Sequence, residues 1–397
     1  MVEAAAVLYF LRTGIKLYLP VWVPFAKKMM GCPERIAIIG RICYNPVDNA
    51  NQIGGTHMSY NPQTEMLRRM EHADFAYRIG DKETLPEWQT RARARLLERL
   101  GLPLEKVAPE TRIEWTREED GYTETRFVFK SEKDVFVPCH LLLPSNSSGG
   151  KLPLVICLQG HSTGMHISLG RPVYPSDAES IAGDRDFARQ AVRRGQAALA
   201  IEQRGFGECG GTPKGPDCHQ VAMQALLLGR TLIGERVWDV SRAIDAVCEA
   251  FPQIEETRIA VMGNSGGGTA TIYAAAVDER ITAAMPSCAI CGFLPSIGAQ
   301  KHCVCNYIPG IMKDFDMAEL CGLVAPRPLV IVTGREDPIF PAWSATEQFE
   351  IARNRYYARA NAQNRICQVI GEGGHRFYAE DGWAAFDRLT GWKESKK

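Results

Sequence analysis

The feature that most constrains the fold is a Gly-Asn-Ser-Gly-Gly segment that begins at Gly263, between an apolar run and a helix-favouring run. The apolar run Ile259–Met262 predicts a strand, and Gly267–Val277 predicts a helix. A strand that turns sharply into a helix needs glycine at both ends of this motif, because a Cβ there would clash with neighbouring backbone. The turn would hold Ser265 in a strained conformation at the positive end of the helix. The motif therefore predicts a nucleophile elbow with Ser265 as the candidate nucleophile.

Apolar runs and helical patterns alternate along the rest of the chain. The expected strands are Leu154–Leu158, Ala197–Ile201, Ile259–Met262, Ile281–Met285, Leu329–Thr333 and Ile366–Ile370. The expected helices are Asp184–Arg194, Glu235–Glu249, Gly267–Val277, Ser344–Ala360 and Gly382–Trp392. Apolar strands that alternate with helices predict an α/β fold, with a mostly parallel sheet covered by helices on both faces.

The chain before this alternation has a different pattern. Its expected elements are two helices, Glu65–Tyr77 and Leu85–Leu100, and a β-hairpin, Thr123–Phe129 with Asp134–Leu143. We therefore expect an N-terminal helical segment over residues 58–120 and a catalytic domain over residues 121–397. A long segment without the alternation, residues 286–326, follows the expected strand Ile281–Met285, which is the sixth when the two hairpin strands are counted, and its length predicts a lid-like insertion.

Residues 1–57 form an extension of doubtful status. Charged side chains interrupt its apolar start, so no uncharged stretch reaches the ~20 residues of a stable membrane span. A polar segment begins at Met58 directly after Gly54-Gly55-Thr56-His57, and Gly-Gly codons can spell a ribosome-binding site. We hypothesise that translation starts naturally at Met58; N-terminal sequencing from the native host would contradict this if the chain began near Met1. The interrupted apolar start, about the first 30 residues, is also compatible with an interfacial amphipathic helix.

Composition narrows the classes of partner. Lys+Arg and Asp+Glu both total 46, and a net charge of zero argues against a nucleic-acid partner. The 13 cysteines are scattered and odd in number, which predicts a reducing cytoplasm rather than a disulfide framework. We expect a cytoplasmic protein that acts on a small molecule, and an oligomer is compatible with the sequence.

A serine nucleophile needs a base that takes its proton and an acid that orients the base. In elbow-type enzymes these groups follow in the order serine, acid, histidine. Only His302 and His375 lie downstream of Ser265. His375 stands in a glycine-rich segment directly after an expected strand, whereas His302 lies in the insertion, far from a strand end. The position after a strand favours His375 as the base.

The acid is expected after the strand that precedes the base. Asp337 follows Leu329–Thr333 and is our choice, with Glu336 as its rival. Asp314 and Asp316 are weaker candidates because they precede that strand.

Two backbone N–H groups are expected to stabilise the negative charge that develops on an attacked carbonyl oxygen. The residue after the nucleophile, Gly266, supplies one of them. The second is expected from the loop after Leu154–Leu158, where Gly160 allows close approach and His161 is the candidate donor. The side chain of His161 could also only pack or shape the pocket.

These residues carry a family resemblance. Leu-Gln-Gly-His, Glu202–Glu208, Gly-Asn-Ser-Gly-Gly-Gly, Gly-Arg-Glu-Asp-Pro-Ile-Phe-Pro and Gly-Gly-His-Arg-Phe together resemble the α/β-hydrolase superfamily. More narrowly, the chain is similar from Met58 onward to the acetyl xylan esterase-like branch, near dienelactone hydrolases and cephalosporin-C deacetylases. The resemblance implies the α/β-hydrolase fold, a triad of Ser265, Asp337 and His375, and N–H donors at His161 and Gly266. The branch often has His-Gly where this chain has Gln159-Gly160, and glucuronoyl esterases usually have Arg at the position of Gly266.

Four aromatic residues near these segments are candidates for substrate contact: Tyr307, Phe340, Trp343 and Phe377. Each could equally belong to the core. The insertion also contains Cys288, Cys291, Cys303, Cys305 and Cys321, and the Cys-x-x-Cys and Cys-x-Cys pairs suggest zinc. Their irregular spacing and apolar surroundings favour buried hydrophobic cysteines. We therefore expect no metal and no cofactor, and stoichiometric zinc would overturn this.

The predicted function is a serine carboxylic-ester hydrolase that works through an acyl-enzyme, and the resemblance implies short acyl groups such as acetyl. Two alternatives stay open. One is a serine oligopeptidase-like hydrolase, and the other is a non-catalytic binding protein with the same fold.

Overall fold

The computed structural model describes residues 51–53, 56–58, 61–145 and 150–392. The chain divides into two units, Met1–Thr64 and Glu65–Lys397. In the first unit, β1 (Asn51–Ile53) and β2 (Thr56–Met58) form a two-stranded antiparallel sheet. Most of the extension expected over residues 1–57 lies outside the described residues, so the hypothesis of a start at Met58 stays a prediction.

A nine-stranded sheet forms the centre of the second unit, in the order β11-β10-β9-β8-β6-β7-β5-β4-β3. The strands are β3 (Arg112–Glu119), β4 (Tyr122–Glu132), β5 (Val135–Pro144), β6 (Leu152–Leu158), β7 (Ala197–Ile201), β8 (Ile254–Asn264), β9 (Ile281–Ser287), β10 (Leu329–Gly334) and β11 (Ile366–Gly371). Neighbours among β6 to β11 pair in parallel, while β5, β4 and β3 add antiparallel strands at one edge. The expected mostly parallel α/β sheet is confirmed.

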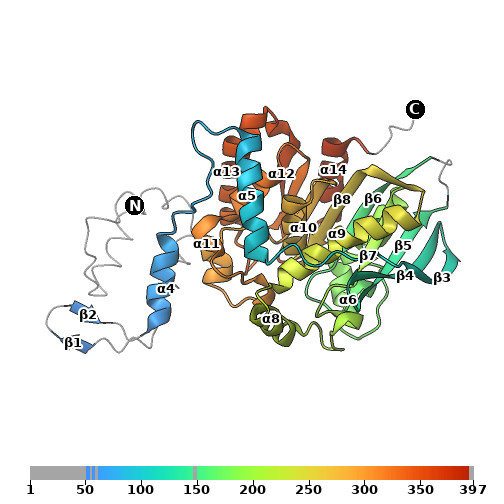
Figure 1. Ribbon diagram of the computed structural model, residues 1–397, viewed down its shortest axis with the longest axis horizontal. Helices are drawn as coiled ribbons and strands as arrows, with labels where there is room; N and C mark the ends of the chain where they lie inside the picture. The colour runs from blue at the N-terminus through green and yellow to red at the C-terminus, as the bar shows by residue number, and fades with distance from the viewer. Residues whose placement is uncertain (1–50, 54–55, 59–60, 146–149, 393–397) are drawn as a thin grey trace. The chain divides into compact units, whose positions relative to one another are not determined.

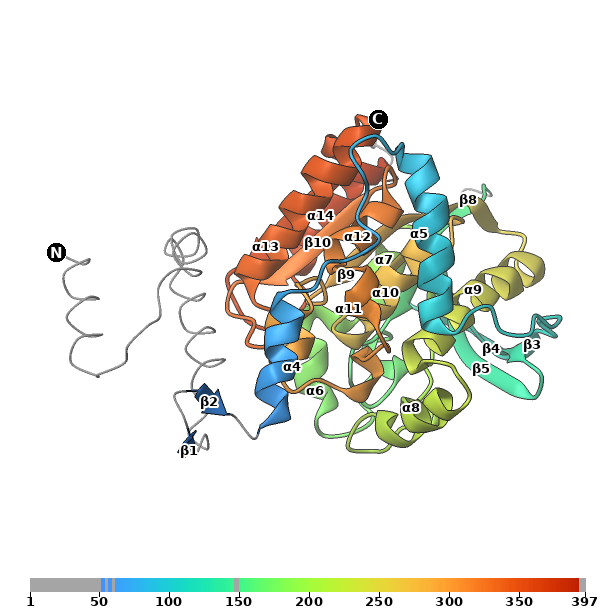
Figure 2. The same ribbon diagram turned by 60° about the vertical axis from the view of Figure 1, so that its left-hand side comes forward.

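Helices cover both faces of this sheet (Figure 1; Figure 2). The helices of the described residues are α4 (Pro62–Glu71), α5 (Leu85–Leu100), α6 (Asp177–Ser180), α7 (Phe187–Arg193), α8 (Cys218–Leu227), α9 (Leu232–Ala250), α10 (Gly266–Val277), α11 (Ile311–Asp314), α12 (Met317–Val324), α13 (Ala342–Ile351) and α14 (Ala379–Thr390). Strand side chains alternate between faces, so Ile156 packs with α5, α9, α10 and α12 in one core. Val155 and Cys157 face the other core, with α7 and α14.

Strand β3 differs from the expectation, because it lies inside the segment predicted to be helical up to residue 120. It pairs with β4 at the edge of the sheet, so the expected boundary falls in the turn between these strands. Most of its side chains are exposed, and Arg117 pairs with Glu124 across the ladder. A polar edge strand lacks the apolar alternation by which a half-buried strand is recognised.

The segment predicted to be a lid-like insertion, residues 286–326, is in large part core. Helix α12 is buried along its whole length and packs against α10 and α13. Cys288, Cys291 and Cys321 are also buried. This part of the segment stabilises the sheet rather than covering a site from outside.

Candidate active site

Ser265 stands at the junction of β8 and α10 with φ 54° and ψ −122°, a conformation that L-residues rarely adopt. Its N–H donates to the carbonyl oxygen of Ser287 over 2.8 Å. A Cβ added at Gly263 would lie 2.5 Å from the Leu158 oxygen, and one at Gly267 only 2.0 Å from it. The turn therefore requires both glycines, and the predicted elbow geometry is present.

Asp337 and His375 follow the neighbouring strands β10 and β11. The Nδ1 atom of His375 lies 2.7 Å from Oδ2 of Asp337. The other carboxylate oxygen, Oδ1, accepts the N–H groups of Ile339 and Phe340, each over 3.0 Å. Both oxygens are thus held by donors, which fixes the carboxylate and, through it, the imidazole ring. The rival Glu336 is exposed to solvent.

The electrostatics of Asp337 favour its charged form. Burial alone would raise its pKa, but the hydrogen bond and charge of His375, with the two backbone N–H donors, hold the pKa below its ordinary value. The other downstream histidine, His302, lies beyond Phe340, and burial lowers its pKa. Its Nε2 contacts the Ser296 hydroxyl rather than a carboxylate.

Strand β9 connects the elbow to the segment that carries the histidine. The hydroxyl of Ser287 donates to Oδ1 of Asn264 over 2.9 Å and approaches the Arg376 carbonyl oxygen at 3.5 Å. Asn264 directly precedes Ser265, and Arg376 directly follows His375. The two segments therefore meet at the carboxyl ends of adjacent parallel strands, where sites of open α/β sheets form.

Cys288 is a neighbour of this site, although the sequence pattern placed it only among the cysteines of the insertion. It has φ 46°, its thiol donates to the Arg376 carbonyl oxygen, and its Sγ lies within 4.8 Å of ligand atoms of Asp337 and His375. Burial, together with the Asp337 charge, raises the pKa of Cys288 to about 12, so it stays a neutral thiol. The signal in the sequence is its place directly after an expected strand, the same place that identified Asp337 and His375.

The two candidate oxyanion donors lie beside the elbow. A Cβ at Gly160 would lie 2.8 Å from the Asn264 oxygen, so the loop after β6 approaches the elbow closely. Among the described residues, the N–H of His161 donates to no backbone or side-chain acceptor. Gly266 begins α10, so its N–H belongs to the first turn, which has no partner within the helix. Both N–H groups are therefore available to a ligand.

The side chain of His161 lies against Cys305 and Gly266. Its Nε2 lies 3.2 Å from the Cys305 sulfur, and its ring lies against Gly266, where an added Cβ would come within 2.6 Å of Cε1. The imidazole therefore belongs to a cluster with Cys218, Cys303 and Cys305, and the backbone N–H rather than the ring is the group offered to a substrate.

The four candidate substrate residues have different surroundings. Phe340 is buried and stacks on His375 with ring centroids 5.8 Å apart, so it borders the site. Phe377 is fully buried in the core and packs edge-on against Phe187, so its predicted substrate contact is wrong. Tyr307 is 46% exposed, and its hydroxyl donates to the Ile297 carbonyl oxygen. Trp343 is half-buried on α13, and its substrate contact stays a prediction.

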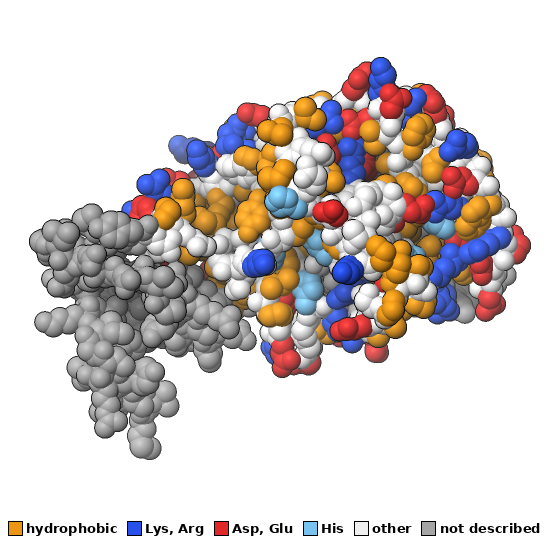
Figure 3. Space-filling view, turned by 90° about the horizontal axis from the view of Figure 1, so that it is seen from below, with side chains coloured by type: hydrophobic (Ala, Val, Ile, Leu, Met, Phe, Trp, Pro, Cys, Tyr) orange, Lys and Arg blue, Asp and Glu red, His pale blue; other side chains and the backbone are white. Residues whose placement is uncertain are grey.

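The surface shown in Figure 3 has acidic and basic side chains interspersed, with histidines near its middle. This mixture agrees with the net charge of zero. None of the helices in the described part of the chain combines the length and hydropathy that a bilayer crossing needs.

The comparisons with known proteins identify esterases. Residues 104–295, which include the His161 loop and the elbow, match the family model of acetyl xylan esterases. The chain is 26% identical to the Bacillus subtilis protein YtaP, which is named as a hydrolase by prediction. The alignment spans 241 residues, or 60% of this chain and 77% of that relative.

Solved structures share the fold. A Bacteroides fragilis protein assigned as an acetyl xylan esterase aligns with a TM-score of 0.68 and 16% identity, over 87% of this chain and 94% of that one. A glucuronoyl esterase of Solibacter usitatus aligns with a TM-score of 0.63 and 14% identity, over 81% and 97%. These likenesses show the fold.

Proposed function

Because this chain is a carboxylic-ester hydrolase related to the acetyl xylan esterases of the α/β-hydrolase superfamily, we propose that it acts through a triad of Ser265, His375 and Asp337. The observation that carries the proposal is the Asp337–His375 hydrogen bond of 2.7 Å, beside a serine on a strained elbow. Three features of different segments, each at a strand end, agree with one chemistry.

The proposed reaction has two halves. The Ser265 hydroxyl attacks the ester carbonyl carbon while Nε2 of His375 takes its proton, and the carbonyl oxygen becomes an oxyanion. The N–H groups of His161 and Gly266 stabilise this charge. Collapse of the intermediate breaks the bond to the alcohol, which leaves with the proton from Nε2. Water then attacks the acyl-enzyme with the same base, and releases the acid and the free serine.

We propose small neutral acyl groups, with acetyl as the first candidate, because the matched family is that of acetyl xylan esterases. Gly266 supports this choice. Glucuronoyl esterases usually carry Arg at this position, and here the His161 ring fills the space that any side chain at residue 266 would enter. This chain therefore does not offer that cation to an acidic sugar.

We also propose that the protein works in the cytoplasm. The cysteines of the described residues are all free, and three of them lie together without a disulfide, which suits a reducing compartment.

The test is hydrolysis of p-nitrophenyl acetate by the wild type and by Ser265→Ala. We expect kcat to fall by roughly 10⁴-fold or more, and the burst of p-nitrophenol that reports the acyl-enzyme to disappear. Ser176→Ala, at an exposed serine outside the site, is the matched control. Equal and negligible rates for wild type and variant would refute the esterase and favour the binding protein. Preferential cleavage of peptide anilides would favour the oligopeptidase.

A further inference from the structure

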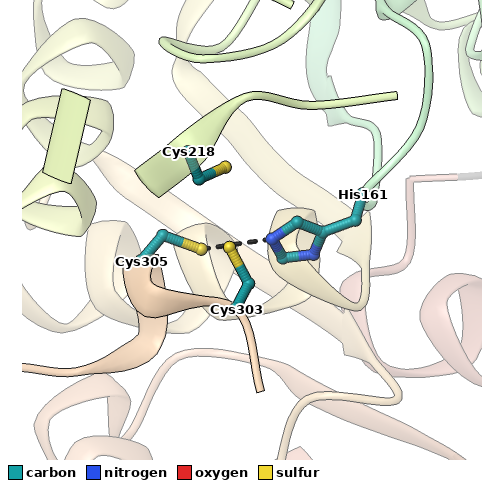
Figure 4. A group of neighbouring side chains, drawn as sticks. All are labelled: His161, Cys218, Cys303 and Cys305. Carbon is teal, nitrogen blue, oxygen red and sulfur yellow. Dashed lines mark hydrogen bonds between the residues drawn. The ribbon is translucent and has the colours of Figure 1, made fainter. Parts of the chain in front are cut away.

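Four side chains from three distant segments converge beside the proposed oxyanion loop (Figure 4). His161 lies in the loop after β6, and Cys218 is the first residue of α8. Cys303 and Cys305 lie at η5 (Val304–Asn306), a short 3-10 helix in the segment after β9. One ligand atom from each residue lies within 4.8 Å of those of the other three. Figure 4 shows the three sulfur atoms and the imidazole edge pointing toward one another.

We propose that these four side chains bind one structural Zn²⁺ ion in a tetrahedral Cys₃His site. Zinc bonds of about 2.3 Å to sulfur and about 2.0 Å to nitrogen place the ligand atoms of a tetrahedron about 3.5–3.8 Å apart. The observed cluster therefore needs only a small contraction around the ion. Four protein ligands leave no open coordination position, which is typical of structural rather than catalytic zinc.

The charges around the cluster fit a zinc site. Arg236 is buried, and its Nη2 donates to the Cys218 sulfur over 3.1 Å. Its guanidinium also donates to the Arg204 carbonyl oxygen and lies 4.3 Å over the Phe206 ring. Within the described residues, its charged neighbours are cysteines, and it makes no ion pair with a carboxylate. A buried cation needs an anionic partner. Three thiolates with Zn²⁺ carry one net negative charge, which Arg236 would balance.

The cluster differs from the other buried cysteines. Cys157 and Cys321 lie among hydrophobic core residues, where a single thiol acts as a small apolar group. The three clustered cysteines also belong to or pack against a small apolar cluster, but their sulfurs face an imidazole and a guanidinium as well. This arrangement also explains why sequence spacing pointed away from zinc. Only the Cys-x-Cys pair is local, and the other two ligands come from positions far upstream.

The ion would hold the oxyanion loop in place. His161 would offer its side chain to the metal and its N–H to the substrate, so the metal would tie this loop to α8 and to η5. This part of the inference depends on the proposed function, whereas the metal site itself does not.

The experiment measures metal content by elemental analysis on the full chain produced in zinc-containing medium and dialysed. We expect about one zinc ion per chain, and below roughly a tenth of an ion for Cys303→Ser and Cys218→Ser. Cys248→Ser, at a half-buried cysteine outside the cluster, is the matched control and should keep the ion. If a variant does not fold, the wild type refolded with Co²⁺ should show thiolate-to-cobalt charge-transfer absorption.

Two results would overturn the site: wild-type protein that folds without metal and without cobalt absorption, or a disulfide between Cys218 and Cys303 or Cys305 in protein kept under reducing conditions. The two proposals fail separately. Protein that binds one zinc but hydrolyses no ester refutes the function alone, and protein that hydrolyses esters without metal refutes the site alone.

Discussion

The replacement Asp337→Asn tests the proposed triad most directly, because the structure dictates how the new amide must lie. Oδ1 of Asp337 accepts two backbone N–H groups, from Ile339 and Phe340. If the amide NH₂ faced them, two donors would be left without acceptors, at about 1–3 kcal/mol each. The amide oxygen therefore takes that side, and the NH₂ group faces Nδ1 of His375.

This orientation of the amide reverses the tautomer of the His375 imidazole. Nδ1 must become an acceptor, so the proton moves to Nε2, which can then no longer take a proton from Ser265. A triad of this kind loses about 10⁴-fold in kcat on Asp→Asn substitution, or about 5.5 kcal/mol of transition-state stabilisation. We expect the same loss here, measured as steady-state p-nitrophenyl acetate hydrolysis. A thermal melt should show that the variant is folded.

Glu336→Gln is the control, because Glu336 is the neighbouring carboxylate and is exposed. It should keep kcat within about two-fold, as expected for a surface substitution. The reasoning is refuted if folded Asp337→Asn retains more than roughly a tenth of wild-type kcat, or if Glu336→Gln loses as much as Asp337→Asn.

Three further changes probe the surroundings of the site. Burial raises the pKa of Glu202 to about 7, so between pH 4.5 and 7 the folded protein binds a proton that the unfolded chain has released. The free energy of unfolding therefore falls as pH rises through this range, by up to about 3 kcal/mol. Glu202→Gln should flatten this part of the pH profile in urea unfolding, and an unchanged slope would assign it to another group. Gly266→Ala should push the His161 ring away, which should lower kcat by about 10–100-fold and also lower the melting temperature, because the same ring is a proposed zinc ligand; full activity would show that the loop adapts. Phe377→Ala should cost about 3–5 kcal/mol of stability in urea unfolding and leave KM unchanged, whereas a raised KM in a fully stable variant would restore the substrate contact.

The elbow and the parallel sheet could be predicted from the sequence because their signals are local. Gly263 and Gly267 are required by contacts with the strand next to them, and the central strands β6 and β7 are continuous apolar runs. The contact between Asp337 and His375 could be predicted for a related reason. Both residues directly follow strands, and parallel strands bring their carboxyl ends to one edge.

The features that were missed depend on tertiary context. Strand β3 is polar and gains its place only from pairing with β4. Phe377 follows the proposed base by two residues, and the chain direction after His375 turns its ring into the core. The cysteine cluster unites α8, η5 and the loop after β6, so no single window of sequence contains it.

The position of β11 has a consequence for the order in which catalytic competence is gained and lost. Among the described strands, β11 lies at the end of the sheet and pairs with β10 alone, yet the residue proposed as the base lies in the loop that follows it. During synthesis, a chain with its elbow already folded would stay inert until this last strand docks. On heating, the edge frays before the interior, so inactivation should precede global unfolding, and activity should report the state of one strand rather than of the whole domain.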